Sequence, residues 1–143
     1  MDRLFLDANV LFALAYGAPR LRWLIEQARQ GRFRLLVSPY VCEEARRNLP
    51  DDEARQRLQE LRLTAHCVPE PSLDVPMPVA LPEKDIPVLA AAIVSGATHL
   101  LTGDFQHFGP YFGRTVLGVT IMTPAQYRRY WESREREPGA PTQ

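Results

Sequence analysis

The sequence has little of several features that mark particular protein classes. It contains two cysteines and three scattered histidines, a set that matches no zinc-ligand spacing. No apolar run is long enough to span a membrane, so we expect no membrane segment. Asp2 and Asp7 interrupt the region where the uncharged core of a signal peptide would lie. We therefore expect a cytoplasmic protein with reduced cysteines.

An excess of charge of one sign is also absent. The 17 basic and 17 acidic residues cancel, so the chain as a whole lacks the basic signature of a nucleic-acid binder. The distribution is uneven, because residues 18–34 carry five arginines and one acid, whereas residues 69–104 carry five acids and one lysine. An acidic focus beside basic surroundings can hold cations and attract a polyanion, although an ordinary solvated surface can show the same counts.

The chain is long enough for one domain with a sizeable core. It has 143 residues, of which 45% are apolar and 24% charged. We expect a single domain over residues 1–132 and a disordered tail over residues 133–143. Six prolines occur in residues 69–87, and we interpret the proline-rich part, 69–83, as an irregular surface loop inside that domain.

Short apolar runs alternate with segments of helical periodicity. Strands are predicted at residues 4–6, 33–38, 64–68, 98–102 and 115–122. Helices are predicted at residues 8–16, 19–31, from Ser38–Pro39 onward, 51–63, 86–97 and after Thr123–Pro124, where Gln126 suits a capping box. This alternation predicts an α/β protein, a three-layer α/β/α sandwich around a mainly parallel sheet of about five strands.

Three aspartates follow strands or begin helices at one edge of the predicted sheet. Ligands of open parallel sheets bind outside the carboxyl ends of the strands, where the next helices begin. Asp7 directly follows the first strand, and Asp104 lies two residues beyond the strand that ends at Thr102. Asp85 begins its helix and is therefore expected at the same edge.

A glutamate joins this group on geometric grounds. Glu44 lies six residues beyond Ser38, in the second turn of the predicted helix. A rotation of about 100° per residue puts Glu44 roughly 60° from the apolar Val41 around the helix axis, and it turns Glu43 toward solvent. We therefore expect Glu44, and not Glu43, to point inward.

Four converging carboxylates would repel one another unless a cation lay between them. Oxygen ligands favour Mg²⁺ or Mn²⁺ over zinc, and such an ion can activate water and stabilise charge on a phosphate. Taken singly, Asp7 and Asp85 suit helix caps, Asp104 a turn and Glu44 a solvated surface. Taken together, the four favour a metal site suited to phosphodiester hydrolysis, with all four as catalytic and metal-binding residues.

Three segments carry a resemblance to a known family. "LFLDANVLFALA", "VSPYVCEEARRNL" and "EKDIPVLAAAIVSGATHLLTGDFQHF" resemble the sequence blocks of PIN domains, which include the ribonuclease toxins of bacterial toxin–antitoxin pairs (VapC-like). The resemblance covers roughly residues 3–125. It implies a metal-dependent endoribonuclease with an RNA substrate, an antitoxin protein as partner and a homodimer. The acidic residues of the family match Asp7, Glu44, Asp85 and Asp104.

The resemblance also implies roles around the acids. Asn9 and Thr102 match the positions that orient the carboxylates, and Arg20, Arg22 and Arg114 become candidates to hold the RNA backbone. The proline-rich loop over residues 69–83 is longer than the compact toxins usually carry.

Other functions start from the same fold. A phosphatase with an aspartate nucleophile would carry a second aspartate where Asn9 stands, and a receiver domain would carry a lysine at a later strand end, whereas Lys84, the only lysine, precedes a helix. A PIN-like module that binds RNA or a partner protein without cleaving it stays open as the alternative.

Overall fold

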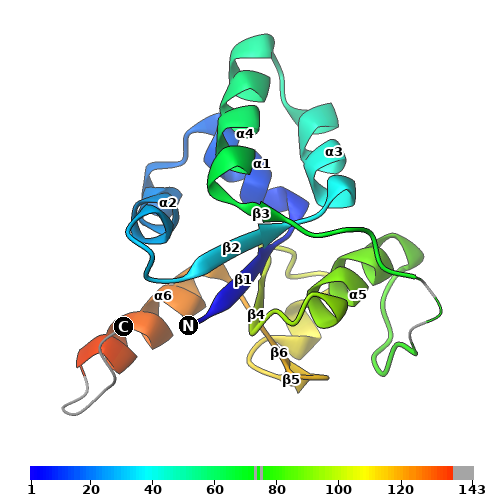
Figure 1. Ribbon diagram of the computed structural model, residues 1–143. Helices are drawn as coiled ribbons and strands as arrows, with labels where there is room; N and C mark the ends of the chain where they lie inside the picture. The colour runs from blue at the N-terminus through cyan, green and yellow to red at the C-terminus, as the bar shows by residue number, and fades with distance from the viewer. Residues whose placement is uncertain (73, 75, 137–143) are drawn as a thin grey trace.

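The protein is built around one sheet of six strands. A computed structural model describes residues 1–72, 74 and 76–136. The strands follow the spatial order β3-β2-β1-β4-β6-β5, in which the first five are parallel and β5 is antiparallel at the edge (Figure 1). They are β1 (Arg3–Leu6), β2 (Arg34–Val37), β3 (His66–Cys67), β4 (His99–Leu101), β5 (Thr115–Val116) and β6 (Val119–Met122).

Helices cover the sheet on both faces, which confirms the predicted α/β/α architecture. They are α1 (Ala8–Tyr16), α2 (Arg22–Arg29), α3 (Pro39–Asn48), α4 (Asp52–Thr64), α5 (Ile86–Val94) and α6 (Pro124–Arg136). Figure 1 shows α1 to α4 above strand β2 and α5 below it, and ring contacts between Trp23 and Tyr127 hold α6 beside α2. Within the described residues, no helix combines the length and apolarity needed to cross a bilayer.

Local signals set the helix ends that matter for the site. Asp7 caps α1, which stops at Gly17, where a positive φ of 96° suits a residue without a side chain. Ser38 caps α3 by accepting a hydrogen bond from Val41 N, and Pro39 occupies its first turn. Because Asp7 and Ser38 directly follow the parallel strands β1 and β2, both helices begin at the carboxyl edge of the sheet.

Two predicted elements differ from the observed ones. The strand predicted over residues 115–122 is a hairpin, because Leu117 and Gly118 both have positive φ (46° and 87°) and form the two-residue reversal between β5 and β6. The helix predicted over residues 19–31 opens with a 3-10 turn, Pro19–Leu21, before α2.

The disordered tail predicted from residue 133 begins too early. Helix α6 continues to Arg136. Near its end, Arg134 forms an ion pair with Asp2, just before β1, with 2.8 Å between Nη2 and Oδ2, and this contact holds the last turns of the helix in place. The same carboxylate accepts a hydrogen bond of 2.6 Å from the Tyr127 hydroxyl. Residues 137–143, the rest of that predicted tail, lie outside the described residues.

The proline-rich segment is attached to the body of the protein. Glu70 accepts a hydrogen bond of 2.8 Å from Tyr40 N, and the Tyr111 hydroxyl donates one of 2.8 Å to Ala80 O. Its apolar side chains Met77, Val79 and Leu81 are partly buried against the core. A short 3-10 turn, Glu83–Asp85, then leads into α5 and brings Asp85 to the carboxyl edge.

Candidate functional site

Asp7 joins the ends of the two central strands. Its Oδ1 accepts a hydrogen bond of 2.7 Å from Ala8 N, and its Oδ2 accepts bonds from Thr102 Oγ1 (2.8 Å) and Asn9 Nδ2 (3.2 Å). Asn9 Oδ1 in turn accepts a bond of 2.7 Å from Gly103 N. With only 4% of its surface exposed, Asp7 is held in one orientation by groups that follow β1 and β4.

The environment of Asp7 opposes its ionisation. Burial raises the pKa of this carboxyl from 3.8 to about 6, the hydrogen bonds from Thr102 and Ala8 act against that rise, and the charges of Glu44 and Asp85 add to it. The carboxylate form is therefore costly in the protein alone, and a cation placed here would stabilise it.

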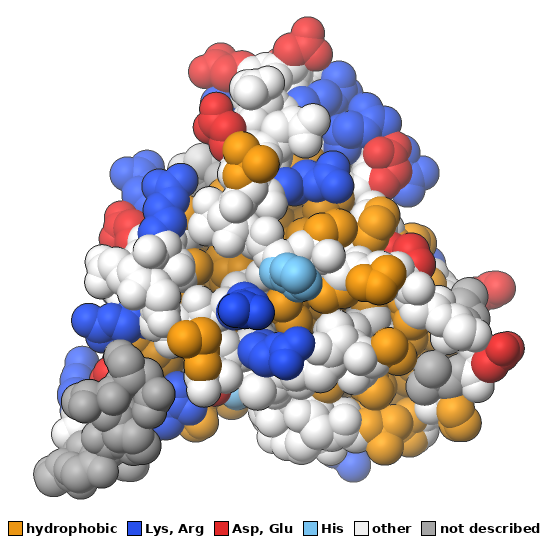
Figure 2. Space-filling view, in the orientation of Figure 1, with side chains coloured by type: hydrophobic (Ala, Val, Ile, Leu, Met, Phe, Trp, Pro, Cys, Tyr) orange, Lys and Arg blue, Asp and Glu red, His pale blue; other side chains and the backbone are white. Residues whose placement is uncertain are grey.

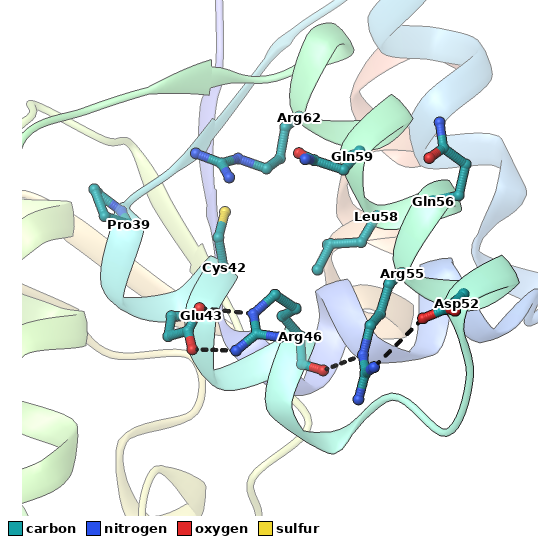
Figure 3. A pocket seen from close by; sticks show the side chains of 10 residues that line it. All are labelled: Pro39, Cys42, Glu43, Arg46, Asp52, Arg55, Gln56, Leu58, Gln59 and Arg62. Atoms are coloured by element: carbon teal, nitrogen blue, oxygen red, sulfur yellow. Dashed lines mark hydrogen bonds and ion pairs between the residues drawn. The ribbon is translucent and has the colours of Figure 1, made fainter.

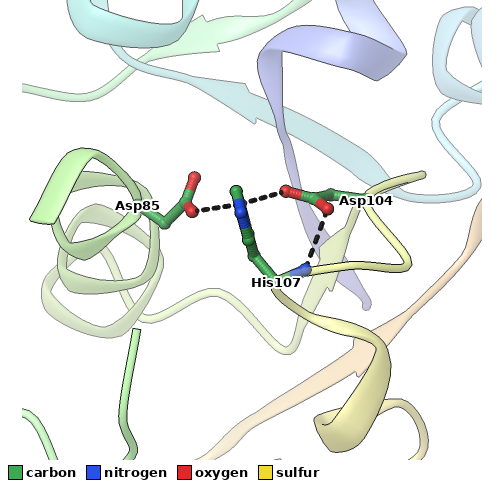
Figure 4. Close-up of side chains that lie close together, drawn as sticks. All are labelled: Asp85, Asp104 and His107. Carbon is green, nitrogen blue, oxygen red and sulfur yellow. Dashed lines mark hydrogen bonds and ion pairs between the residues drawn. The ribbon is translucent and has the colours of Figure 1, made fainter. Parts of the chain in front are cut away.

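Asp85 and Asp104 meet a histidine at the same edge. His107 Nδ1 lies 2.8 Å from Asp85 Oδ2 and 2.9 Å from Asp104 Oδ2 (Figure 4). Asp104 Oδ1 also accepts a hydrogen bond of 3.0 Å from His107 N, which fixes the turn after β4. Burial and the charge of Asp104 raise the pKa of Asp85, while His107 and Lys84 lower it.

This cluster fits a divalent cation. Two of its buried atoms, Asp85 Oδ2 and His107 Nδ1, have no aligned hydrogen bond to any described residue despite their short contact. The ligand atoms of Asp85, Asp104 and His107 lie within 4.8 Å of one another. The carboxylate oxygens are ligands that Mg²⁺ and Mn²⁺ prefer, whereas the imidazole nitrogen is a ligand typical of transition-metal ions.

Glu44 completes the acidic wall. A cavity of about 290 Å³ is lined by Asp7, Glu44, Asp85, Asp104 and Asn9 together with Ala8, Phe12, Ala45, Asn48 and Lys84. Glu43, the next residue on α3, points away and forms an ion pair of 2.7 Å with Arg46. The helix thus turns one glutamate toward the other acids and the adjacent one toward solvent.

Sequence reasoning missed His107 as a member of this cluster. The histidines were counted only as zinc ligands, and a single histidine completes no zinc site. A local pattern could have identified it. In a turn that begins with an aspartate, the residue three positions later can donate its backbone N–H to the aspartate carboxylate, which brings the two side chains close together. His107 follows Asp104 at that spacing.

A larger cavity, of about 530 Å³, lies between α3 and α4 and holds none of the predicted site residues (Figure 3). Figure 2 shows Lys and Arg side chains gathered around these helices. Two of the arginines that line the cavity are already paired, Arg46 with Glu43 and Arg55 with Asp52. Burial raises the pKa of the Cys42 thiol to about 11, so this cysteine is a poor nucleophile. This cavity therefore offers fewer side chains suited to catalysis than the acidic cavity does.

The three predicted RNA-contact arginines lie apart. Arg20 lines a third cavity, of about 450 Å³, which shares Asn9 with the acidic cavity. Arg22 is exposed on α2, and Arg114 lies 6.0 Å from the centre of the Tyr111 ring. Neither Arg22 nor Arg114 lines any of the three cavities. Only Arg20 is thus adjacent to the acids.

Comparison with known proteins identifies the family and the fold of this chain. A sequence model of the PIN domain matches residues 3–106, a range that contains all four acids. Among solved structures, a chain from the crystal structure of VapBC2 from Rickettsia felis bound to a DNA fragment from their promoter is similar in fold. It has 11% sequence identity and a TM-score of 0.60, and the likeness covers 85% of this chain and 98% of that chain. No curated protein matches. Since the family match spans most of the chain, this protein belongs to the PIN domain family.

Proposed function

We propose that this protein is a metal-dependent endoribonuclease that hydrolyses RNA phosphodiester bonds at its acidic cavity. The observation that carries the proposal is the convergence of Asp7, Glu44, Asp85 and Asp104 on one cavity. The ligand atoms of Asp85, Asp104 and His107, which all lie within 4.8 Å of one another, support it. Membership of the PIN domain family agrees with a hydrolase of this class.

The acids are proposed to hold one or two Mg²⁺ or Mn²⁺ ions. Asp7, Asp85 and Asp104 are the ligands, and Glu44 is a further ligand or positions a water molecule. A bound divalent ion supplies an activated water and neutralises the charge that develops on the phosphate.

The surrounding residues orient this machinery. Thr102 and Asn9 donate to the same oxygen of Asp7, which leaves its remaining lone pairs in a fixed direction. Arg20, Arg22 and Arg114 are proposed to hold the RNA backbone, and such contacts position a substrate without reading its sequence.

We further propose that the protein acts as the toxin of a toxin–antitoxin pair, as a homodimer inhibited by an antitoxin protein. The likeness to a chain of VapBC2 supports this part. Expression of the chain alone should arrest growth, and Asp7→Asn should abolish the arrest. Normal growth with the wild-type protein present at full level would contradict the toxin role and leave the ribonuclease proposal standing.

The ribonuclease proposal is tested by cleavage of structured and unstructured RNA. Wild-type protein should cleave with Mg²⁺ or Mn²⁺ and stop when EDTA is added. Asp7→Asn and Glu44→Gln should lose cleavage, whereas Glu43→Gln, a matched change on the adjacent residue of α3, should retain it.

The outcomes separate the two interpretations. Equal cleavage by wild type and Asp7→Asn would mean a contaminating nuclease and would overturn the proposal. Binding of RNA by the wild type with no cleavage of any RNA in either metal would instead favour the non-catalytic module. Measurement of Mn²⁺ affinity by calorimetry checks the metal site independently, since Asp85→Asn should weaken it.

A further inference from the structure

The third cavity lies beside the acidic one and differs from it in chemistry. It is hollowed at the carboxyl ends of β1, β4 and β6, between α1, the start of α2 and the first turn of α6. Its walls include the rings of Phe105 and Trp23 and the side chains of Arg20 and Arg128. Among the described residues that line it, none is acidic. The cavity therefore offers aromatic surface and positive charge immediately next to four carboxylates.

The two cavities share a wall. Asn9 lines both, and its Oδ1 accepts a hydrogen bond of 2.7 Å from Gly103 N. Gly103 faces the third cavity, and Asp104, the next residue, faces the acidic one. Phe105 directly follows Asp104 in the sequence, so a chain bound at the acids lies near the aromatic wall of the third cavity.

The aromatic and basic groups suit a nucleotide. Phe105 is 70% exposed, and its ring meets that of Phe112 edge to face, with 5.2 Å between the ring centres. Arg128 lies over the Trp23 ring, 5.2 Å from its centre, and has one exposed acidic neighbour, Glu132 at 3.6 Å. Arg20 has no ion pair with any described residue, so its charge is available to an incoming phosphate.

We propose that this cavity binds the nucleotide adjacent to the scissile phosphate of single-stranded RNA. The base stacks on Phe105, and Arg20 and Arg128 contact the neighbouring phosphate. This inference rests on the proposed function, and it assigns a second binding subsite for the same substrate. A base must leave its helix to expose a face to an aromatic side chain, so double-stranded RNA cannot use this cavity.

Binding is measured without cleavage in the Asp7→Asn background, by fluorescence anisotropy of a labelled single-stranded RNA oligonucleotide in Mg²⁺. Phe105→Ala should raise Kd about tenfold, as loss of one stacked base does. Phe105→Leu should behave like Phe105→Ala, whereas Phe105→Trp should restore affinity. Because Phe105 is mostly exposed, these variants should fold normally, which thermal melting checks.

The arginines are tested with a control on the same helix. Arg20→Gln and Arg128→Gln should each weaken binding several-fold at low salt and reduce the slope of log Kd against log salt by about 0.7. Arg129→Gln, one residue away on α6 and outside the cavity, should leave both unchanged. Tyr16→Ala, an exposed aromatic at the end of α1, is the matched control for Phe105.

Three results would overturn the inference. Unchanged affinity in Phe105→Ala would remove the stacking site, and equal losses in Arg129→Gln would reduce the arginine effect to overall charge. Binding of an RNA duplex with the same dependence on Phe105 would contradict the single-strand assignment. A cavity that served a protein segment instead would leave RNA affinity unchanged in every variant. Failure of the proposed function is separate, because wild-type protein would then cleave no RNA whatever the anisotropy shows.

Discussion

Strand β1 has a buried aspartate at each end, and the two have opposite surroundings. Asp2, before the strand, is 8% exposed and Asp7, after it, is 4% exposed. Burial would raise the pKa of Asp2, but hydrogen bonds from Arg134 and Tyr127 outweigh it and lower that pKa below its usual value. Burial raises the pKa of Asp7 to about 6, and its charged neighbours are other acids.

This contrast distinguishes a structural carboxylate from one suited to chemistry. Asp2 has a cation and a hydroxyl within 2.8 Å, so its charge is satisfied by the fold. Asp7 has hydrogen-bond donors but no cation, so its charge is satisfied only when something is added. Burial alone therefore does not identify a functional aspartate, whereas burial without a counter-charge does.

The largest expected effect concerns activity. Asp7→Asn should lower the RNA cleavage rate by about 100- to 1,000-fold, because it removes a charge on which the metal centre depends. Asp2→Asn should leave the rate unchanged at a temperature where the variant is folded. Single-turnover cleavage in Mn²⁺ measures both. Loss of activity in both variants while both remain folded would break the distinction between the two residues.

The second effect is a pH dependence specific to Asp7. Its folded-state pKa of about 6 lies above the ordinary 3.8, so its contribution to stability is complete below about pH 4 and is lost as the pH rises through 6. In EDTA, the free energy of unfolding of the wild type relative to Asp7→Asn should fall by about 2 kcal/mol between pH 4 and pH 7. Urea denaturation at four pH values measures this, and saturating Mn²⁺ should diminish the fall. A difference that does not change with pH would contradict the raised pKa.

The third effect concerns the stability contributed by Asp2. Asp2→Asn should lower the free energy of unfolding by about 2 kcal/mol at pH 7, because it removes the charge that binds Arg134 and Tyr127. The lowered pKa of Asp2 means that this contribution exists above pH 4 and is lost as the pH falls through the folded-state value. The difference in stability between wild type and variant should therefore narrow as the pH falls below 4. Urea denaturation of both proteins from pH 7 to pH 3 measures this, and a constant gap would contradict it.

The smallest effects are expected when the hydroxyl group that donates a hydrogen bond to each aspartate is removed. Tyr127→Phe removes the donor to Asp2 and should cost about 1 kcal/mol of stability with no change in cleavage. Thr102→Val removes the donor to Asp7 and should lower cleavage about tenfold, since it frees the orientation of that carboxylate. Thermal melting and cleavage assays on both variants measure this, and similar effects on activity would contradict it.

Structural features that depend on a single segment were predicted correctly from the sequence. The strand at β1, the cap at Asp7 and the start of α3 after Ser38 each depend on neighbours within a few residues. The inward direction of Glu44 follows from helical rotation, and the acidic cavity contains it while Glu43 points to Arg46. Such features follow from backbone geometry and the hydrophobic pattern, which are local.

Contacts between segments that lie far apart in the sequence were not predicted. Arg134 binds Asp2 across 132 positions, and this contact keeps α6 helical where a tail was expected. The hairpin turn at Leu117–Gly118 was hidden because leucine rarely adopts a positive φ. The place of Arg128 in the third cavity, over the Trp23 ring, depends on where α6 docks.

The sequence alone therefore determined the fold class and the edge at which the acids gather. Asp7, Asp85 and Asp104 each follow a strand or open a helix, and the rotation of its helix turns Glu44 toward them. Only the tertiary structure decided which charges are neutralised. It brought Arg134 to Asp2 and left Asp7 among acids, and it set His107 between Asp85 and Asp104. The reason is physical, since electrostatic pairing depends on distances of a few ångströms between side chains that the chain separates by tens of residues.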